Sequence, residues 1–215
     1  MKGLAPHTEY IFEAVSRLDC IKPYVLVGGT ALSLQLATRE SEDLDFMSWR
    51  ERRNDKCEVY WPYIKKELET VGEVQKCDIL GLDHVEFVLS GVKISFYANP
   101  HFSPLKEKIR YLDNLYIADK TSIGAMKMEV LLRRSKFRDY YDIYSLLEAG
   151  ESLQEMMDME LRYSGHKLKS KNLIAMLTRS DRFEEDRNFA ALHPIYDITP
   201  KDIEARIISV LAPGL

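Results

Sequence analysis

The chain has 215 residues with 46% hydrophobic and 30% charged side chains, and its formal net charge at pH 7 is −4. This composition is typical of a globular protein large enough for one domain or two small ones. The negative balance argues against broad, charge-driven binding of nucleic acid, although it allows a local basic patch. No apolar run approaches the roughly 20 residues of a membrane helix, and the N-terminal stretch lacks the apolar core of a signal peptide. The three cysteines are isolated in sequence, which argues against a disulfide framework or a zinc site. We therefore expect a cytoplasmic protein without membrane contact.

Hydrophobic periodicity and turn residues predict the elements in chain order. Residues 8–19 predict a helix, the apolar run at 24–27 predicts a buried strand, and the polar residues 48–59 predict a loop or the start of the next helix. Further helices are expected at 60–71, 119–135, 137–148, 151–163, 170–179 and 200–211. Further strands are expected at 73–79, 84–89, 92–97 and 115–117, and irregular segments at 101–110 and 181–194.

This order predicts an α/β (α+β) fold, in which a mixed sheet with helices is followed by a C-terminal helical bundle. The change from strands to helices falls between 105 and 120. We place the boundary so that an α/β domain covers 1–115 and a helical domain covers 116–215.

The segment from Val25 to Leu36 predicts a phosphate-binding turn. An apolar strand is followed by Gly28 and Gly29, then by Thr30 and an apolar-periodic helix. Glycines let the backbone approach a ligand closely, and the free N–H groups at a helix start favour an anion. Thr30 is expected to cap this helix or to hydrogen-bond a phosphate oxygen.

Two carboxylates follow at a spacing that suits a metal ion. Asp43 and Asp45 alternate with Leu44 and Phe46, so in a strand both acidic side chains share one face. Mg²⁺ is usually held by one or two carboxylates together with substrate phosphates. A phosphate-binding turn beside such a pair predicts metal-assisted nucleotidyl transfer.

A second group of charged residues lies at 127–142, KMEVLLRRSKFRDYYD. Lys127 and Arg134 fall on one stripe of a predicted helix that is partly apolar, where cations need an anionic partner such as a triphosphate. Asp139 and Asp142 are three residues apart and share a face of the next helix. The alternative is a salt-bridged helical hairpin in which Arg134 or Arg138 pairs with these aspartates.

These motifs resemble a known family. Gly28-Gly29-Thr30 with Arg39, Ser41, Asp43 and Asp45 resembles the minimal nucleotidyltransferase signature of the DNA polymerase beta superfamily. The spacing is most similar to that of the AbiEii nucleotidyltransferase toxins of bacterial type IV toxin–antitoxin systems. Residues 127–142 resemble a second segment of that family, with Val130 in place of its alanine. The resemblance covers roughly the first 150 residues.

The resemblance implies a nucleotidyltransferase fold and a role for each motif residue. Asp43, Asp45, Lys127 and Asp139 are implied as catalytic residues, and Asp43 and Asp45 would hold Mg²⁺. The nucleotide phosphates would be held by Gly28, Gly29, Thr30, Arg39, Ser41, Lys127 and Arg134.

One departure from the wider superfamily concerns a third carboxylate on a later strand, which completes a two-metal site or acts as a base. Ser95 occupies the position where an aspartate is expected, and a hydroxyl is a weak Mg²⁺ ligand. Glu86 on the neighbouring strand is a candidate substitute, with an exposed strand residue as the simpler interpretation. Asp139 is a candidate base.

Three functions fit these observations. The first is a Mg²⁺-dependent enzyme that moves a nucleoside monophosphate from an NTP to an acceptor; the resemblance implies a toxin acting on tRNA or protein, with a cognate antitoxin. The second is a nucleotide-binding, catalytically silent module that recruits a protein partner. The third is a nucleotidyltransferase with a small-molecule acceptor.

Overall fold

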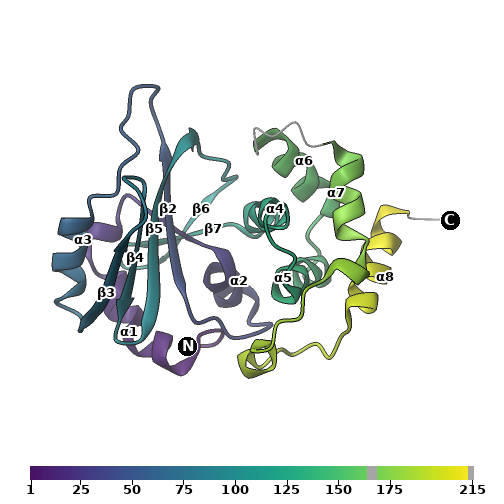
Figure 1. The fold of residues 1–215 in the computed structure, drawn as a ribbon, viewed down its shortest axis with the longest axis horizontal. Coiled ribbons are helices and arrows are strands. Elements are labelled where there is room, and N and C mark those ends of the chain that lie inside the picture. The colour runs from purple at the N-terminus through teal and green to yellow at the C-terminus, as the bar shows by residue number, and fades with distance from the viewer. Residues whose placement is uncertain (164–168, 213–215) are drawn as a thin grey trace. The chain divides into compact units, whose positions relative to one another are not determined.

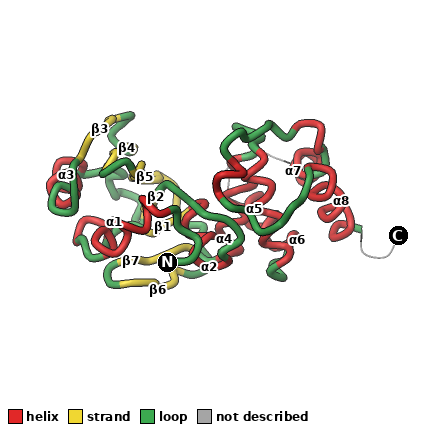
Figure 2. Tube along the Cα trace, turned by 90° about the horizontal axis from the view of Figure 1, so that it is seen from below, coloured by secondary structure: helices red, strands yellow, loops and turns green. Residues whose placement is uncertain are grey.

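The computed structural model describes residues 1–163 and 169–212, and the chain divides into two compact units, Met1–Asp119 and Lys120–Leu215 (Figure 1). All strands of the sheet lie in the first unit, whereas the described part of the second consists of helices and turns (Figure 2). The last strand, β7 (Leu115–Ala118), pairs with β1 within the sheet, so the division falls directly after it. Within the described ranges, no helix is long and apolar enough to cross a membrane.

The first unit is built on a seven-stranded sheet in the order β3-β4-β5-β2-β1-β7-β6. The pairs β1–β7 and β2–β5 are parallel and the others are antiparallel, which confirms the mixed sheet. The strands are β1 (Val25–Val27), β2 (Leu44–Arg50), β3 (Val74–Ile79), β4 (His84–Leu89), β5 (Val92–Phe102), β6 (Lys108–Leu112) and β7 (Leu115–Ala118).

The central strands have one apolar and one polar face. On the apolar face, the rings of Phe46 in β2 and Phe96 in β5 stack with their centroids 5.1 Å apart, and both side chains are buried. On the polar face, strand pairing sets Asp45, Ser95 and Glu86 side by side across β2, β5 and β4. Alternation along each strand therefore separates the core from the carboxylates.

Helices cover both sides of this sheet. Figure 1 shows α1 (Pro6–Ser16) and α3 (Trp61–Leu68) on one side and α2 (Gly28–Leu36) on the other. Ile11 of α1 and Ile64 of α3 are each 2% exposed, as expected for the inward stripe of an amphipathic helix.

The second unit is helical, as the sequence predicts. Helix α4 packs against α5 and α6, and α5 and α6 also contact α8. The final helix begins with a capping box in which Thr199 and Asp202 bond each other's backbone amides. The helices are α4 (Lys120–Val130), α5 (Phe137–Glu148), α6 (Leu153–Tyr163), α7 (Ser170–Leu177) and α8 (Pro200–Leu211), and two 3-10 turns cover Ser180–Arg182 and Phe189–Leu192.

Two segments differ from the sequence-based expectation. Residues 101–110 are not irregular throughout, because β5 runs on to Phe102 and β6 pairs with β7. The proline at 100 is accommodated by a shift in register between Asn99 and Phe102, where β5 follows β2. Helix α4 ends at Val130 instead of 135, since residues 135–137 pair through backbone hydrogen bonds with Glu184.

Candidate active site

The turn between β1 and α2 packs directly on the residues predicted to act with it. Gly28 has a φ of +70°, and a Cβ built on it would lie 3.0 Å from Oδ2 of Asp45. A Cβ on Gly29 would lie 2.6 Å from Nη2 of Arg39 and 3.1 Å from Oγ of Ser41. The two glycines are thus required for positive φ at one position and for close approach at the other.

Thr30 has a structural contact in place of the expected cap. The residue before α2 is Val27, and no side chain caps the helix. The Thr30 side chain is 1% exposed, its hydroxyl lies 2.9 Å from Oγ of Ser41, and it donates to the backbone carbonyl of Asp43. The capping role is therefore wrong, and Thr30 instead fixes the segment before β2 against α2.

Arg39 and Ser41 are held in the connection from α2 to β2. Ala37 ends α2 in the left-handed conformation, with a φ of +51°, which turns the chain back towards the glycines. Arg39 is 4% exposed and its Nη1 donates to the carbonyl of Glu40 at 2.8 Å. The amide of Ser41 donates to the carbonyl of Gly3 at 3.0 Å, so the N-terminal segment also supports this connection.

The two aspartates lie at the start of β2. Asp45 pairs with Val27 of β1 and with Ser95 of β5, and it is half-buried. Asp43 precedes the first residue of the strand and is exposed. The Ser95 hydroxyl donates to Oδ1 of Asp45 at 2.6 Å, a short distance typical of a hydroxyl bound to a carboxylate.

Ser95 thus occupies the place beside Asp45, and Glu86 follows it on β4. Oε1 of Glu86 lies 2.8 Å from Nζ of Lys93 and 3.6 Å from Nε2 of His84. Although partial burial opposes it, Glu86 and the more distant Asp45 raise the pKa of Lys93. Among the residues that the structure describes, no group of three His, Cys, Asp or Glu side chains is placed to hold a metal ion.

The second charged group forms one network within the second unit. Nζ of Lys127 lies 2.9 Å from Oδ1 of Asp139 and 2.7 Å from Oδ2 of Asp142. Arg134 donates to both oxygens of Asp139, at 2.9 and 3.1 Å. Because α4 ends before Arg134, that side chain reaches the network from the turn after α4 and not from the expected helical stripe.

Burial and charge act against each other at Asp139, which is 0% exposed. Burial alone would raise the pKa of its carboxyl group, but Lys127 and Arg134 outweigh it and hold that pKa below its usual range. The hairpin alternative is confirmed for Arg134, which pairs with Asp139, while Arg138 pairs with Asp186. Sequence spacing offers no signal for this partner, which lies 48 residues away.

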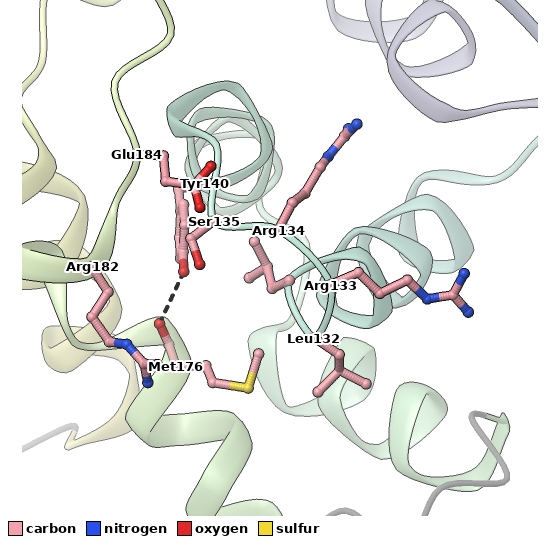
Figure 3. A pocket seen from close by; sticks show the side chains of 9 residues that line it. Leu132, Arg133, Arg134, Ser135, Tyr140, Met176, Arg182 and Glu184 are labelled. Atoms are coloured by element: carbon pink, nitrogen blue, oxygen red, sulfur yellow. Dashed lines mark hydrogen bonds between the residues drawn. The ribbon is translucent and has the colours of Figure 1, made fainter.

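A cavity of about 220 Å³ opens beside the turn after α4 (Figure 3). Tyr140 and Arg182 line it, and the Tyr140 hydroxyl donates to the carbonyl of Met176 at 3.3 Å. Figure 3 shows the side chains of Arg133 and Arg134 pointing away from Tyr140. Arg134 of the charged network nevertheless lines the cavity together with Arg133 and Arg182, so the cavity borders the network on its cationic side.

Comparison with known proteins places this arrangement in a family. Residues 11–206 match the family described as nucleotidyl transferase AbiEii toxin, Type IV TA system. The chain is 28% identical over 159 residues to the uncharacterized protein aq_aa25 of Aquifex aeolicus, which covers 73% of each chain.

Two solved structures are similar in fold. MenT4, a nucleotidyltransferase toxin of Mycobacterium tuberculosis H37Rv, has a TM-score of 0.59 and 17% identity, covering 96% of this chain and 80% of its own. JHP933 of Helicobacter pylori has a TM-score of 0.50 and 15% identity, covering 95% and 90%. At these identities the likeness shows the nucleotidyltransferase fold alone. The match over most of the sequence shows more: the chain belongs to the AbiEii family of nucleotidyltransferase toxins.

Proposed function

We propose that this nucleotidyltransferase transfers a nucleoside monophosphate from an NTP to an acceptor hydroxyl, with Mg²⁺ held by Asp43 and Asp45. The observation that carries the proposal is the packing of the Gly28-Gly29 turn on Asp45 and Arg39. It brings backbone amides, a carboxylate and a guanidinium to one place, which is the donor set that a metal-bound triphosphate requires.

The residues present fit Mg²⁺. Asp43 is exposed, and Asp45 keeps Oδ2 towards the glycine turn while Oδ1 accepts from Ser95. Two carboxylates leave the remaining coordination positions to substrate phosphates and water, as Mg²⁺ prefers. When bound, the ion neutralises charge that develops on the phosphates as pyrophosphate leaves.

The chain's own groups bind and orient the phosphates. The amides of Gly28 and Gly29 at the start of α2 favour an anion, and the Arg39 guanidinium beside them supplies a fixed positive charge. The Thr30 and Ser41 hydroxyls are bonded to each other, so they act on the phosphates by holding the turn and the strand start in register.

Lys127 and Arg134 are proposed as phosphate-binding cations of the second unit. Asp139 and Asp142 hold the Lys127 ammonium in place, and Asp139 also orients Arg134. A buried carboxylate bonded to two cations is a poor proton acceptor, because taking a proton would break both pairs. We therefore assign Asp139 the role of a positioning residue, in place of a base.

The transfer balances as a substitution at phosphorus. The acceptor oxygen forms a bond to the α-phosphorus, the bond from that phosphorus to the bridging oxygen breaks, and pyrophosphate leaves while the hydroxyl proton passes to solvent.

We propose tRNA as the first acceptor to test and protein as the second. We also propose a cognate antitoxin as a partner, and the cytoplasm, where these substrates occur, as the location.

The test is incubation of the pure protein with Mg²⁺, each α-³²P-labelled NTP in turn, and either total tRNA or a cytoplasmic protein fraction. Label on one acceptor, absent with Asp45→Asn, identifies the nucleotide and the acceptor together. Wild-type transfer by Asp45→Asn would refute the mechanism.

A second candidate is a nucleotide-binding module without catalysis. Ser95 beside Asp45, in place of a carboxylate, is the observation that favours it. Saturable Mg²⁺-dependent NTP binding without transfer to tRNA, protein or small-molecule hydroxyls would establish this alternative.

A further inference from the structure

Another cavity, of about 570 Å³, lies in the first unit. The proposed transfer reaction does not use it. Its walls come from the end of β2, the segment that follows it and the start of α3, and they include Trp49, Arg50, Tyr60 and Tyr63. This volume is within the usual range of small-molecule sites.

The cavity is separate from the candidate active site. Asp45 is the second residue of β2 and Arg50 is the last, so about 16 Å of strand lies between them at roughly 3.3 Å per residue. Neither the glycine turn nor the two aspartates line the cavity.

Arg50 provides the first sign of an absent ligand. Its Nε atom is buried and has no hydrogen-bond partner among the described residues. A buried donor without an acceptor is costly, and most such groups in folded proteins are paired. Arg50 also lines the cavity, so a turn of its side chain that exposes Nε would let an acceptor atom inside the cavity satisfy this donor.

Aromatic side chains provide the second sign. The rings of Tyr60 and Tyr63 are nearly parallel, at 25°, with centroids 6.4 Å apart, and these side chains are 70% and 40% exposed. Trp49 and Tyr24 also line the cavity, and Tyr24 is buried edge-on against Phe96. Exposed aromatic faces around one cavity favour a planar ring that stacks on them.

The charges of the cavity limit what that ring carries. Four carboxylates line it, from Asp19, Glu51, Asp55 and Glu58, against the two cations of Arg50 and Lys56. This excess of negative charge disfavours a phosphate. Asp19 already pairs with Lys22, and Asp55 accepts from two backbone amides, so Glu51 and Glu58 are the candidate acceptors for N–H groups of a ligand. A ligand that fits this cavity therefore needs hydrogen-bond acceptors for the arginine and hydrogen-bond donors for the carboxylates.

We propose that this cavity binds a nucleobase, with a guanine-type edge as the best match, through stacking on the tyrosines and hydrogen bonds from Arg50. Guanine presents two acceptors, O6 and N7, that suit an arginine, and its N1 and N2 donors suit a carboxylate. The site is independent of the transfer reaction, and its ligand is either a free nucleoside or a base within an RNA strand.

The experiment is titration of the full chain with guanosine by calorimetry, without Mg²⁺, with cytidine as the comparison. We expect saturable binding of guanosine that is weakened about tenfold or more by Arg50→Gln, since a hydrogen bond to a charged group is lost. Arg53→Gln is the matched control: it removes the same charge from the same segment at an exposed residue that does not line the cavity, and we expect less than a twofold change. Far-ultraviolet circular dichroism checks that both variants fold.

Asp45→Asn distinguishes this site from the active site, and we expect it to leave guanosine binding unchanged. Tighter binding of a short RNA strand that contains one guanine would identify the base within RNA as the ligand, and weaker binding would identify the free nucleoside. The proposal is overturned if guanosine does not bind, if cytidine binds equally well, if Asp45→Asn abolishes binding, or if Arg50→Gln has no more effect than Arg53→Gln.

Discussion

Replacement of Asp139 by alanine is expected to destabilise the second unit strongly. Asp139 is 0% exposed and bonds both Lys127 and Arg134, so its removal takes one of two neighbouring carboxylates from the buried Lys127 ammonium and leaves Asp142 beside it. Breaking a buried ion pair by removing one partner typically costs about 3–5 kcal/mol. Because Asp142 still compensates Lys127, we expect the lower end, about 3 kcal/mol.

Urea unfolding followed by far-ultraviolet circular dichroism measures this loss. With a urea dependence of about 1–3 kcal/mol per M, a loss of about 3 kcal/mol lowers the midpoint by roughly 1–3 M. Asp181→Ala is the matched control, because it breaks an arginine–aspartate pair that is 62% exposed on the aspartate side. We expect no measurable change in its midpoint.

The effect also depends on pH in a defined direction. The folded-state pKa of Asp139 lies below its usual value, so its contribution is fully present above about pH 4 and is lost as the pH falls through the folded-state pKa. The difference between wild type and Asp139→Ala should therefore shrink below pH 4. Equal midpoints for Asp139→Ala and Asp181→Ala at pH 7 would refute the buried network as a source of stability.

Substitutions at three further positions test the turn and the strand beside it. Gly29→Ala places a Cβ 2.6 Å from Nη2 of Arg39. We expect it to lower the free energy of unfolding, followed in a thermal melt, by about 1–3 kcal/mol and to reduce transfer by the folded protein. Unchanged transfer would contradict the proposed role of the turn. Ser95→Ala removes the hydrogen bond to Asp45, so the Mg²⁺ concentration for half-maximal transfer should rise about tenfold. Ser95→Thr keeps the hydroxyl and should keep the wild-type Mg²⁺ concentration. Equal values for the two variants would argue against a positioning role. Thr30→Val should lower the free energy of unfolding by about 1–2 kcal/mol and Thr30→Ser by clearly less, and equal losses would show that the hydroxyl contacts contribute nothing.

The sequence was sufficient for the mixed sheet, the helical second part and the family. Strands such as β2 alternate apolar and polar residues, and this alternation is visible in a single sequence. The chemistry of the proposed site requires particular side chains at fixed spacing, and a single sequence also displays that spacing directly. The side on which Asp45 lies follows from the same alternation, because Leu44 and Phe46 enter the core.

Contacts between distant segments could not be predicted in this way. The approach of Arg39 to Gly29 depends on the left-handed Ala37 that reverses the chain, and alanine gives little sign of that conformation. The end of α4 before Arg134 depends on pairing with Glu184, far along the chain. Periodicity reports only local preference, and here a tertiary contact overrides it.

The bulge in β5 shows the same limit at a proline. Asn99-Pro100 is a turn signal in sequence, yet the strand continues to Phe102 because β2 supplies a partner beyond the shift in register. The cavity at the end of β2 could not be predicted either, because its walls combine residues that are distant in sequence, such as Tyr24, Arg50 and Asn99.

The most direct test of the central claim compares pyrophosphate release with incorporation of label from the α-phosphate, in the presence of Mg²⁺, an NTP and the acceptor. The wild type should release one pyrophosphate per label transferred, and no label from the γ-phosphate should reach the acceptor. Asp45→Asn should abolish both signals, whereas Asp78→Asn, which removes an aspartate paired with Lys76 on β3, should keep them. Transfer of γ-phosphate label, or equal pyrophosphate release by wild type and Asp45→Asn, would contradict nucleotidyl transfer at this site.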